Sequence, residues 1–112
     1  RGRPMTAPWI FVVQLEVDAD VEDEWNEWYN TVHLPEVMAA SPAIVRATRF
    51  RQTGGSGTKP YCAIYEFESE QGLHDFMASD RLAEMSADYN RDWGAKSSRF
   101  NHAYVAFVER ER

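Results

Sequence analysis

The sequence predicts an α+β fold whose elements follow the order strand, helix, strand, strand, helix, strand. Two observations support this order: four stretches have the alternating or continuous apolar residues of strands, and two others repeat apolar residues at the three- and four-residue spacing of helices. Two halves with the same β-α-β pattern are typical of a ferredoxin-like sandwich with a four-stranded antiparallel sheet. The chain of 112 residues is long enough for one such domain.

We expect this single domain to occupy residues 5–112, with Met5 as the native start and residues 1–4 as a leftover of expression or a disordered N-terminus. The sequence has no apolar run of membrane-spanning length and no secretory leader pattern. Its one cysteine, Cys62, excludes an internal disulfide bond. These features favour a reducing, cytoplasmic location.

Four strands are expected, over residues 9–17, 44–52, 60–68 and 102–109. The first has one face that is apolar throughout, whereas its other face combines two apolar residues with Gln14 and Glu16. The second and third flank a glycine-rich turn at residues 53–58, so they should form an antiparallel hairpin.

The first helix is expected to begin at Val21, because Asp20 is a good N-cap and the acidic residues that follow suit the helix dipole. Pro35 disfavours helical geometry at the residue before it, so the helix should end at about His33. That places a histidine on the last helical turn.

The second helical region is expected to begin after Ser69, a good cap, and to be interrupted near residues 79–80. Apolar residues continue at helical spacing on both sides of the break. Gly94 is expected to end the region in the left-handed conformation that glycine adopts readily.

Apolar residues on both faces of the strands predict a second cover for the sheet. The third strand has Tyr65 on one face and Ile64 on the other, and the fourth has Val105 and Tyr104. Two helices cover only one face, and a face that met water should alternate with polar residues. We therefore expect a homodimer, in which two sheets face each other and form a barrel with a two-fold axis. The alternative is crowding within a small core.

Charge and motifs exclude several classes of partner. The net charge of −6 argues against nucleic acid and against anionic membranes, because both need a basic surface. The sequence has no glycine-rich phosphate loop and no serine nucleophile elbow. His33 with Glu36 is only the start of a metal site, and no clustered His or Cys completes it. We expect neither a metal nor a cofactor.

The best candidate for chemistry is His33. Trp25, Trp28, Tyr29 and Val32 fall on one side of a helix, and His33 follows Tyr29 by four residues, which makes the two side chains neighbours. A histidine beside a phenol under aromatic cover can give or take a proton near neutral pH. The alternative is a capping histidine that bonds the last carbonyls of its own helix.

Further polar residues are candidates for substrate binding. Asn30 could polarise a carbonyl group from the same helix as His33. Arg46 and Arg49 point to opposite faces of the second strand, so at most one of them faces a cavity. The predicted substrate-binding residues are Trp25, Trp28, Asn30, Arg49, Gln14 and Tyr65, and the predicted catalytic residues are His33 and Tyr29.

Two segments carry a family resemblance. Residues 24–37 read EWNEWYNTVHLPEV, and residues 67–81 read FESEQGLHDFMASDR. Together with the strand that contains Arg46 and Arg49, they resemble the dimeric α/β-barrel superfamily, and within it the EthD-like branch. The resemblance extends from Trp9 to Val108. It implies a homodimer with a pocket between sheet and helices, and it places the family histidine at His33 with its aromatic neighbour at Tyr29.

The resemblance also implies a range of activities. Members include cofactor-independent monooxygenases, muconolactone-type isomerases, polyketide cyclases, decarboxylases and haem-degrading enzymes. The haem-degrading pattern is not met, because the third strand has no Trp and the first has no Asn. The leading hypothesis is therefore a small cofactor-free enzyme with acid–base chemistry on a hydrophobic cyclic or aromatic carbonyl compound, as an isomerase, cyclase or decarboxylase. The alternatives are a non-catalytic homodimer that binds a small hydrophobic ligand or assists a partner enzyme, a cofactor-free monooxygenase, and a pure dimerisation module.

Overall fold

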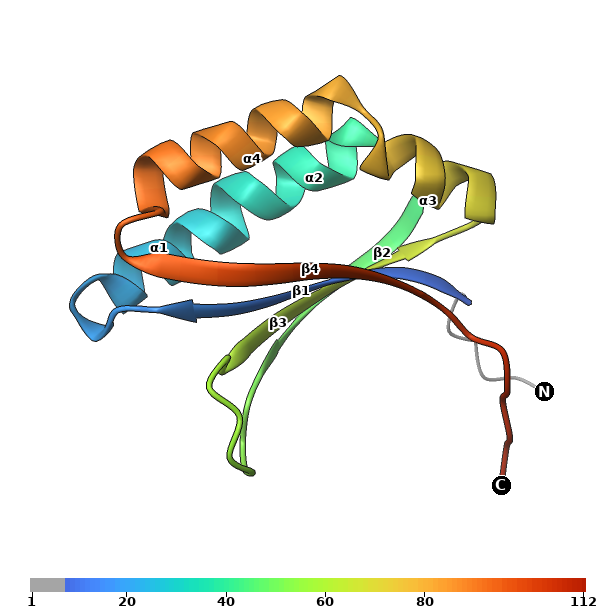
Figure 1. The fold of residues 1–112 in the computed structure, drawn as a ribbon, viewed down its shortest axis with the longest axis horizontal. Helices are drawn as coiled ribbons and strands as arrows, with labels where there is room; N and C mark the ends of the chain where they lie inside the picture. The colour runs from blue at the N-terminus through green and yellow to red at the C-terminus, as the bar shows by residue number, and fades with distance from the viewer. Residues whose placement is uncertain (1–7) are drawn as a thin grey trace.

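The computed structural model describes residues 8–112 of the chain. The expected start at Met5 and the expected leftover at residues 1–4 lie outside the described residues. Four strands form one antiparallel sheet in the order β2-β3-β1-β4 (Figure 1). They are β1 at Trp9–Val17, β2 at Ile44–Arg51, β3 at Tyr61–Phe67 and β4 at Ser97–Val105. The predicted ferredoxin-like α+β fold is confirmed.

All the long helices lie on one face of this sheet (Figure 1). In chain order they are α1 at Glu22–Trp28, a π-helical turn η2 at Tyr29–His33, α2 at Leu34–Ala40, α3 at Glu70–Met77 and α4 at Asp80–Trp93. In the described part of the chain, no helix is long and apolar enough to cross a membrane. The core lies between the two layers and is unusually aromatic, with Phe11, Trp25, Tyr29, Tyr61, Tyr65, Phe67, Phe76 and Tyr89 all buried.

The first helix does not end at His33, as predicted from Pro35, but continues to Ala40. The reason is the π turn η2, in which the backbone N–H of Leu34 bonds to the carbonyl of Tyr29, five residues earlier. Pro35 then falls in the first turn of α2, where its missing N–H costs nothing. The wider turn also changes which residues face the core, so Val32 is 42% exposed instead of lying on the predicted apolar stripe.

Three predicted boundaries also differ. Asp20 does not cap α1, because residues 19–21 first form a 3₁₀ turn (η1, Ala19–Val21), and α1 begins at Glu22 without a side-chain cap. Gly94 is not left-handed: its φ is −61°, and the chain leaves α4 through a turn in which Lys96 N donates to Trp93 O at 2.9 Å. The fourth strand begins at Ser97 and not at residue 102.

Other local predictions are confirmed. Ser69 caps α3 by accepting a hydrogen bond from Gly72 N, and Ser79 caps α4 in the same way through Leu82 N, at the predicted break. The strands β2 and β3 form the predicted hairpin, with an irregularity in register between Ile44 and Arg46.

The face of the sheet turned away from the helices is uncovered in the single chain. Residues that pair across the strands show which side chains share it: Ile10 lies opposite Tyr104 and Glu66, and Gln14 lies opposite Phe100 and Cys62. Large apolar side chains on this open face are exposed, among them Phe50, Phe100 and Tyr104. The expectation that both faces hold apolar residues is confirmed, but none of residues 8–112 covers the second one.

Candidate active site

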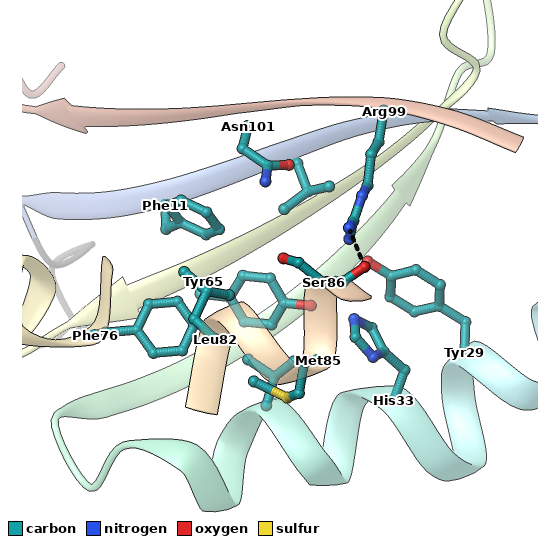
Figure 2. A pocket seen from close by; sticks show the side chains of 12 residues that line it. Phe11, Tyr29, His33, Tyr65, Phe76, Leu82, Met85, Ser86, Arg99 and Asn101 are labelled. Carbon is teal, nitrogen blue, oxygen red and sulfur yellow. Dashed lines mark hydrogen bonds between the residues drawn. The ribbon is translucent and has the colours of Figure 1, made fainter. Parts of the chain in front are cut away.

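An inner cavity of about 20 Å³ lies between the sheet and the helices. His33 and Tyr29 reach it from the first helix, Tyr65 from β3, and Arg99 and Asn101 from β4 (Figure 2). The remaining lining residues are apolar apart from Ser86: Phe11, Val13, Val37, Phe76, Leu82 and Met85. The cavity is therefore an apolar space with a few convergent polar groups, which is the usual composition of a small-molecule site.

The His33 ring lies in an aromatic layer. It stacks nearly parallel on Trp28, with centroids 4.9 Å apart and an interplanar angle of 18°. It also meets the Tyr29 ring edge-on at 4.8 Å. The side chain is only 7% exposed, and no group among residues 8–112 forms a hydrogen bond with it. Its ring nitrogens are therefore not engaged by helix carbonyls, which the capping interpretation required.

His33 is held in its neutral form. Burial lowers its pKa to about 4, and the positive charges of Arg99 and Arg49 act in the same direction. At neutral pH one ring nitrogen can therefore accept a proton, whereas the other keeps its N–H as a hydrogen-bond donor, and the ring is not an imidazolium acid.

The two phenols beside His33 are held in their protonated forms. Burial raises the pKa of Tyr29 well above its ordinary value and that of Tyr65 to about 12. The Tyr65 hydroxyl is buried and has no hydrogen-bond partner of good geometry among residues 8–112. Since an unpaired buried hydroxyl is costly, this group is poised to donate to a ligand.

Arg99 reaches the cavity from β4. Its place is fixed by register, because Arg99 pairs with the buried Leu15 and shares its face of the sheet. Its guanidinium lies 4.2 Å from the centroid of the Tyr89 ring, and Nη2 donates to the carbonyl of Ser86 on α4 at 3.3 Å. The sequence-based prediction missed this residue because it began the last strand at residue 102, five residues too late. The alternation of Phe100, His102 and Tyr104 is the signal that would have placed Arg99 on the opposite, inner face.

Arg49 lies behind Tyr29, on the same helix-covered face of the sheet as Ala63. Its guanidinium is within 4.3 Å of the Tyr29 ring centroid, 5.1 Å of Trp25 and 5.4 Å of Tyr61. Nη1 donates to Asn30 Oδ1 at 2.7 Å, whereas Nη2 is buried and unpartnered in the described chain. Burial also lowers the pKa of Arg49. As predicted for this pair, Arg46 and Arg49 point to opposite faces: Arg49 faces inward, whereas Arg46 lies on the open face and pairs with Glu66 at 2.7 Å.

A chain of hydrogen bonds fixes the aromatic layer against the sheet. Trp25 Nε1 donates to Tyr89 Oη at 3.0 Å, and Ser97 Oγ donates to the Glu16 carbonyl at 2.9 Å. Tyr89 Oη and Ser97 Oγ are 2.5 Å apart, so the free proton of Tyr89 completes the chain. This chain ties α1, α4, β4 and β1 together beside the cavity.

The predicted site residues do not all meet. His33, Tyr29 and Tyr65 line the cavity, and Trp28 stacks on His33 without lining it. Trp25, Arg49 and Asn30 form the layer behind Tyr29. Gln14 lies elsewhere, exposed on the open face of the sheet. Besides Arg99, sequence reasoning missed eight lining residues as site residues. Half of them come from α4 and β4, and the others are apolar residues of β1, α2 and α3: Leu82, Met85, Ser86 and Asn101, and Phe11, Val13, Val37 and Phe76.

Metal ligands do not cluster in the described chain. No group of three or more His, Cys, Asp or Glu residues within residues 8–112 is arranged to hold a metal ion. The cavity lining contains one histidine and no carboxylate or cysteine.

The family model of DUF4286, described as a domain of unknown function, matches residues 9–105 of the chain. No curated protein matches the sequence.

Solved structures of the same fold include an EthD-like protein from Ralstonia eutropha JMP134, with 18% identity and a TM-score of 0.62, covering 93% of this chain and 96% of that one. A second is SnoaB, a cofactor-independent oxygenase from Streptomyces nogalater, here as its mutant N63A, with 16% identity, a TM-score of 0.61, and coverage of 92% and 97%. A third is the haem degrader MhuD from Mycobacterium tuberculosis with two haems bound in its active site, with 13% identity, a TM-score of 0.62, and coverage of 93% and 100%. The EthD-like resemblance is thus confirmed for the fold.

Proposed function

The chain belongs to the DUF4286 family, and we propose that it is a small enzyme that performs acid–base chemistry on a hydrophobic cyclic or aromatic carbonyl compound. The observation that supports this most is the pairing of a neutral, unbonded His33 with two protonated phenols in one apolar cavity. SnoaB, a cofactor-independent oxygenase, has the same fold, but at 16% identity this likeness shows the fold alone and does not select an activity. The haem degrader gives no reason to propose haem, because at 13% identity the likeness shows the fold only.

Each group has a role that follows from its protonation state. His33 takes the proton from the carbon next to the substrate carbonyl, because its ring is neutral and its nitrogens are free. The hydroxyls of Tyr29 and Tyr65 donate hydrogen bonds to the oxygen on which negative charge develops. In an isomerisation the protonated His33 then returns the proton to another carbon. In a cyclisation the carbanion attacks a second carbonyl carbon, and the proton goes to that carbonyl's oxygen. A decarboxylation shares only the stabilisation of the negative oxygen, because loss of carbon dioxide itself leaves the carbanion.

The cavity must widen to take a ring. Its volume of about 20 Å³ is enough for about one water molecule. The wall most able to yield is formed by Leu82 and Met85 of α4, since methionine adapts readily. Next to them, a single hydrogen bond of 3.3 Å joins Arg99 to the backbone of Ser86. We therefore propose that the substrate reaches His33 between α4 and β4.

Proton exchange tests the proposal without knowledge of the natural substrate. With 2-tetralone in deuterated water, wild-type protein should speed the exchange of the protons next to the carbonyl, followed by proton NMR. His33→Gln should reduce this catalysed rate about 100-fold, the lower end of the effect of a positioned base. The rate should be constant above about pH 5 and fall as the pH drops through about 4, because protonation removes the base.

His74→Gln is the matched control, because His74 is exposed on α3, does not line the cavity, and should leave the exchange rate unchanged. Equal exchange by wild type and His33→Gln would contradict the enzyme proposal. If cyclic ketones bind and shift NMR signals of the cavity residues but exchange no faster than in buffer, the protein is the non-catalytic binding module instead.

Cofactor-free oxygenation shares the first step of this chemistry. Removal of a proton by His33 leaves a carbanion, which in an oxygenase reacts with molecular oxygen. Oxygen uptake during the exchange experiment distinguishes an oxygenase from the other activities. Uptake that depends on His33 indicates an oxygenase, and exchange without uptake indicates an isomerase, cyclase or decarboxylase.

We also propose that the protein is a homodimer that covers the open face of its sheet. Phe50, Phe100 and Tyr104 are each half exposed there, which is unusual for a face that meets water. Tyr104→Lys should shift the mass measured by light scattering from that of a dimer to that of a monomer, because it places a charge within the interface. Met77→Lys adds the same charge at an exposed apolar residue on α3 and should stay dimeric. A monomeric wild type would end this proposal.

A further inference from the structure

Two arginines beside the cavity have no acidic partner. Arg99 donates only to a backbone carbonyl, and Arg49 donates only to the amide of Asn30. Within residues 8–112, neither forms an ion pair with a carboxylate, although the chain has 18 acidic residues and a net charge of −6. By contrast, Arg46, Arg81 and Arg91 all pair with carboxylates.

The positive charges of Arg99 and Arg49 both lie close to the inner cavity. Arg99 lines the cavity directly, whereas Arg49 packs on the ring of Tyr29, which lines it. The fields of both reach His33 and Tyr65. Arg49 Nη2 is buried without a partner, and the cavity lining contains no carboxylate that could balance the two charges. Such an arrangement is stabilised when a ligand brings the missing negative charge.

We propose that the ligand of this cavity is a ring compound that carries a carboxylate, with the carboxylate bound by Arg99 and its charge further balanced by Arg49. This inference rests on the proposed function, which places the reacting carbon beside His33. It adds the class of substrate to that proposal. A guanidinium presents its N–H groups in a planar fork that matches a carboxylate. The apolar and aromatic lining, from Phe11 to Met85, suits the ring.

Binding of the anion has a consequence for the base. In the free protein, both arginines disfavour a positive charge on His33, and its pKa lies near 4, which is low for a base that works at neutral pH. A carboxylate bound to Arg99 offsets these charges and raises the pKa of His33 toward its ordinary value of 6.5. The substrate therefore strengthens the base that acts on it.

Matched ligands of equal shape test the inference. The probes are 2-naphthoate and 2-naphthamide, whose binding is measured by calorimetry and by the titration of His33 in NMR spectra. Wild type should bind the naphthoate at least about 10-fold more tightly than the amide, in keeping with hydrogen bonds to a charged group. Arg99→Gln should remove that preference, and Arg99→Lys should restore part of it because it keeps the charge. Naphthoate, but not naphthamide, should raise the pKa of His33.

Arg91→Gln is the control, because Arg91 lies on the exposed side of α4, where it pairs with Asp88 and Asp92. It should bind both probes as wild type does. A folded Arg99→Gln variant that keeps the naphthoate preference, or a wild type that binds the two probes equally, would overturn the inference. If His33-dependent exchange of 2-tetralone is seen in that case, the proposed function stands without it. If naphthoate binding depends on Arg99 but the protein does not speed the proton exchange of 2-tetralone, the cavity is an anion-binding site and the enzyme proposal is wrong.

Discussion

Replacement of Trp25 by alanine should lower the free energy of unfolding by about 4 kcal/mol, as expected for the loss of a buried tryptophan. The Trp25 side chain is 0% exposed, and it packs on Tyr61 with ring centroids 5.0 Å apart and on Tyr29 at 5.3 Å. Its removal also takes away one wall of the aromatic box around Arg49 and the donor to Tyr89. Urea unfolding followed by circular dichroism measures the effect.

Two tryptophan-to-phenylalanine variants separate the hydrogen bond from the packing. Trp25 Nε1 donates to Tyr89 Oη, whereas the buried Trp93 Nε1 has no partner in the described chain. Trp25→Phe should therefore cost about 1–2 kcal/mol more than Trp93→Phe, because only the first leaves a buried hydroxyl without its donor. If the two variants are equally stable, the hydrogen-bond chain through Tyr89 and Ser97 does not hold the aromatic layer in place.

Acidification from pH 7 to pH 4 should cost the fold about 3 kcal/mol through His33 alone. In the unfolded chain this histidine takes up a proton below its ordinary pKa of 6.5, whereas in the folded protein its pKa is about 4. Between these values the unfolded state binds the proton and the folded state does not, so stability falls as the pH falls. Each pKa unit corresponds to about 1.4 kcal/mol, so the whole difference between the two pKa values is worth about 3.5 kcal/mol. About 3 kcal/mol of it is lost by pH 4, where the folded-state histidine is half protonated.

The pH series needs a comparison that isolates this one residue, since carboxylates also take up protons in acid. His33→Gln should flatten the dependence between about pH 6.5 and pH 4 relative to wild type, because a neutral amide replaces the titrating ring. If NMR shows that His33 of the folded, ligand-free protein titrates near pH 6.5, its side chain is not buried as described. Both this prediction and the proposed role of His33 as the base would then be wrong.

The sequence was sufficient to locate three of the four strands, because strand patterns depend on simple alternation, whereas the fourth strand was placed five residues too late. The spacing of apolar residues alone predicted the inner face of β1, which holds Phe11, Val13 and Leu15. The helix caps at Ser69 and Ser79 depend only on local hydrogen bonding. The contact between Tyr29 and His33 was likewise predicted, because it needs only a separation of four residues on a helix.

The remaining parts of the site depend on contacts between segments that are distant in the sequence. Arg99 lies beside the cavity only because β4 pairs with β1 in a register that sets it opposite Leu15. The hydrogen bond from Trp25 to Tyr89 joins residues that are 64 positions apart, and no local sequence pattern predicts it. The depressed pKa of His33 results first from burial, which the packing of the whole helix layer produces. The prediction that Pro35 ends the first helix was also wrong, because it assumed regular α-helical hydrogen bonds up to the proline.

The π turn at residues 29–33 explains a spacing that a regular helix cannot support. Trp25, Tyr29, His33 and Val37 are all buried, and each follows the previous one by four positions. In a regular α-helix every fourth residue advances by about 40° beyond a full turn, so the first and last of these would point about 120° apart. One widened turn takes up most of that drift. If residues 29–33 kept regular α-helical hydrogen bonds instead, Val37 and the rest of α2 would rotate away from the sheet, because no wider turn would take up the drift.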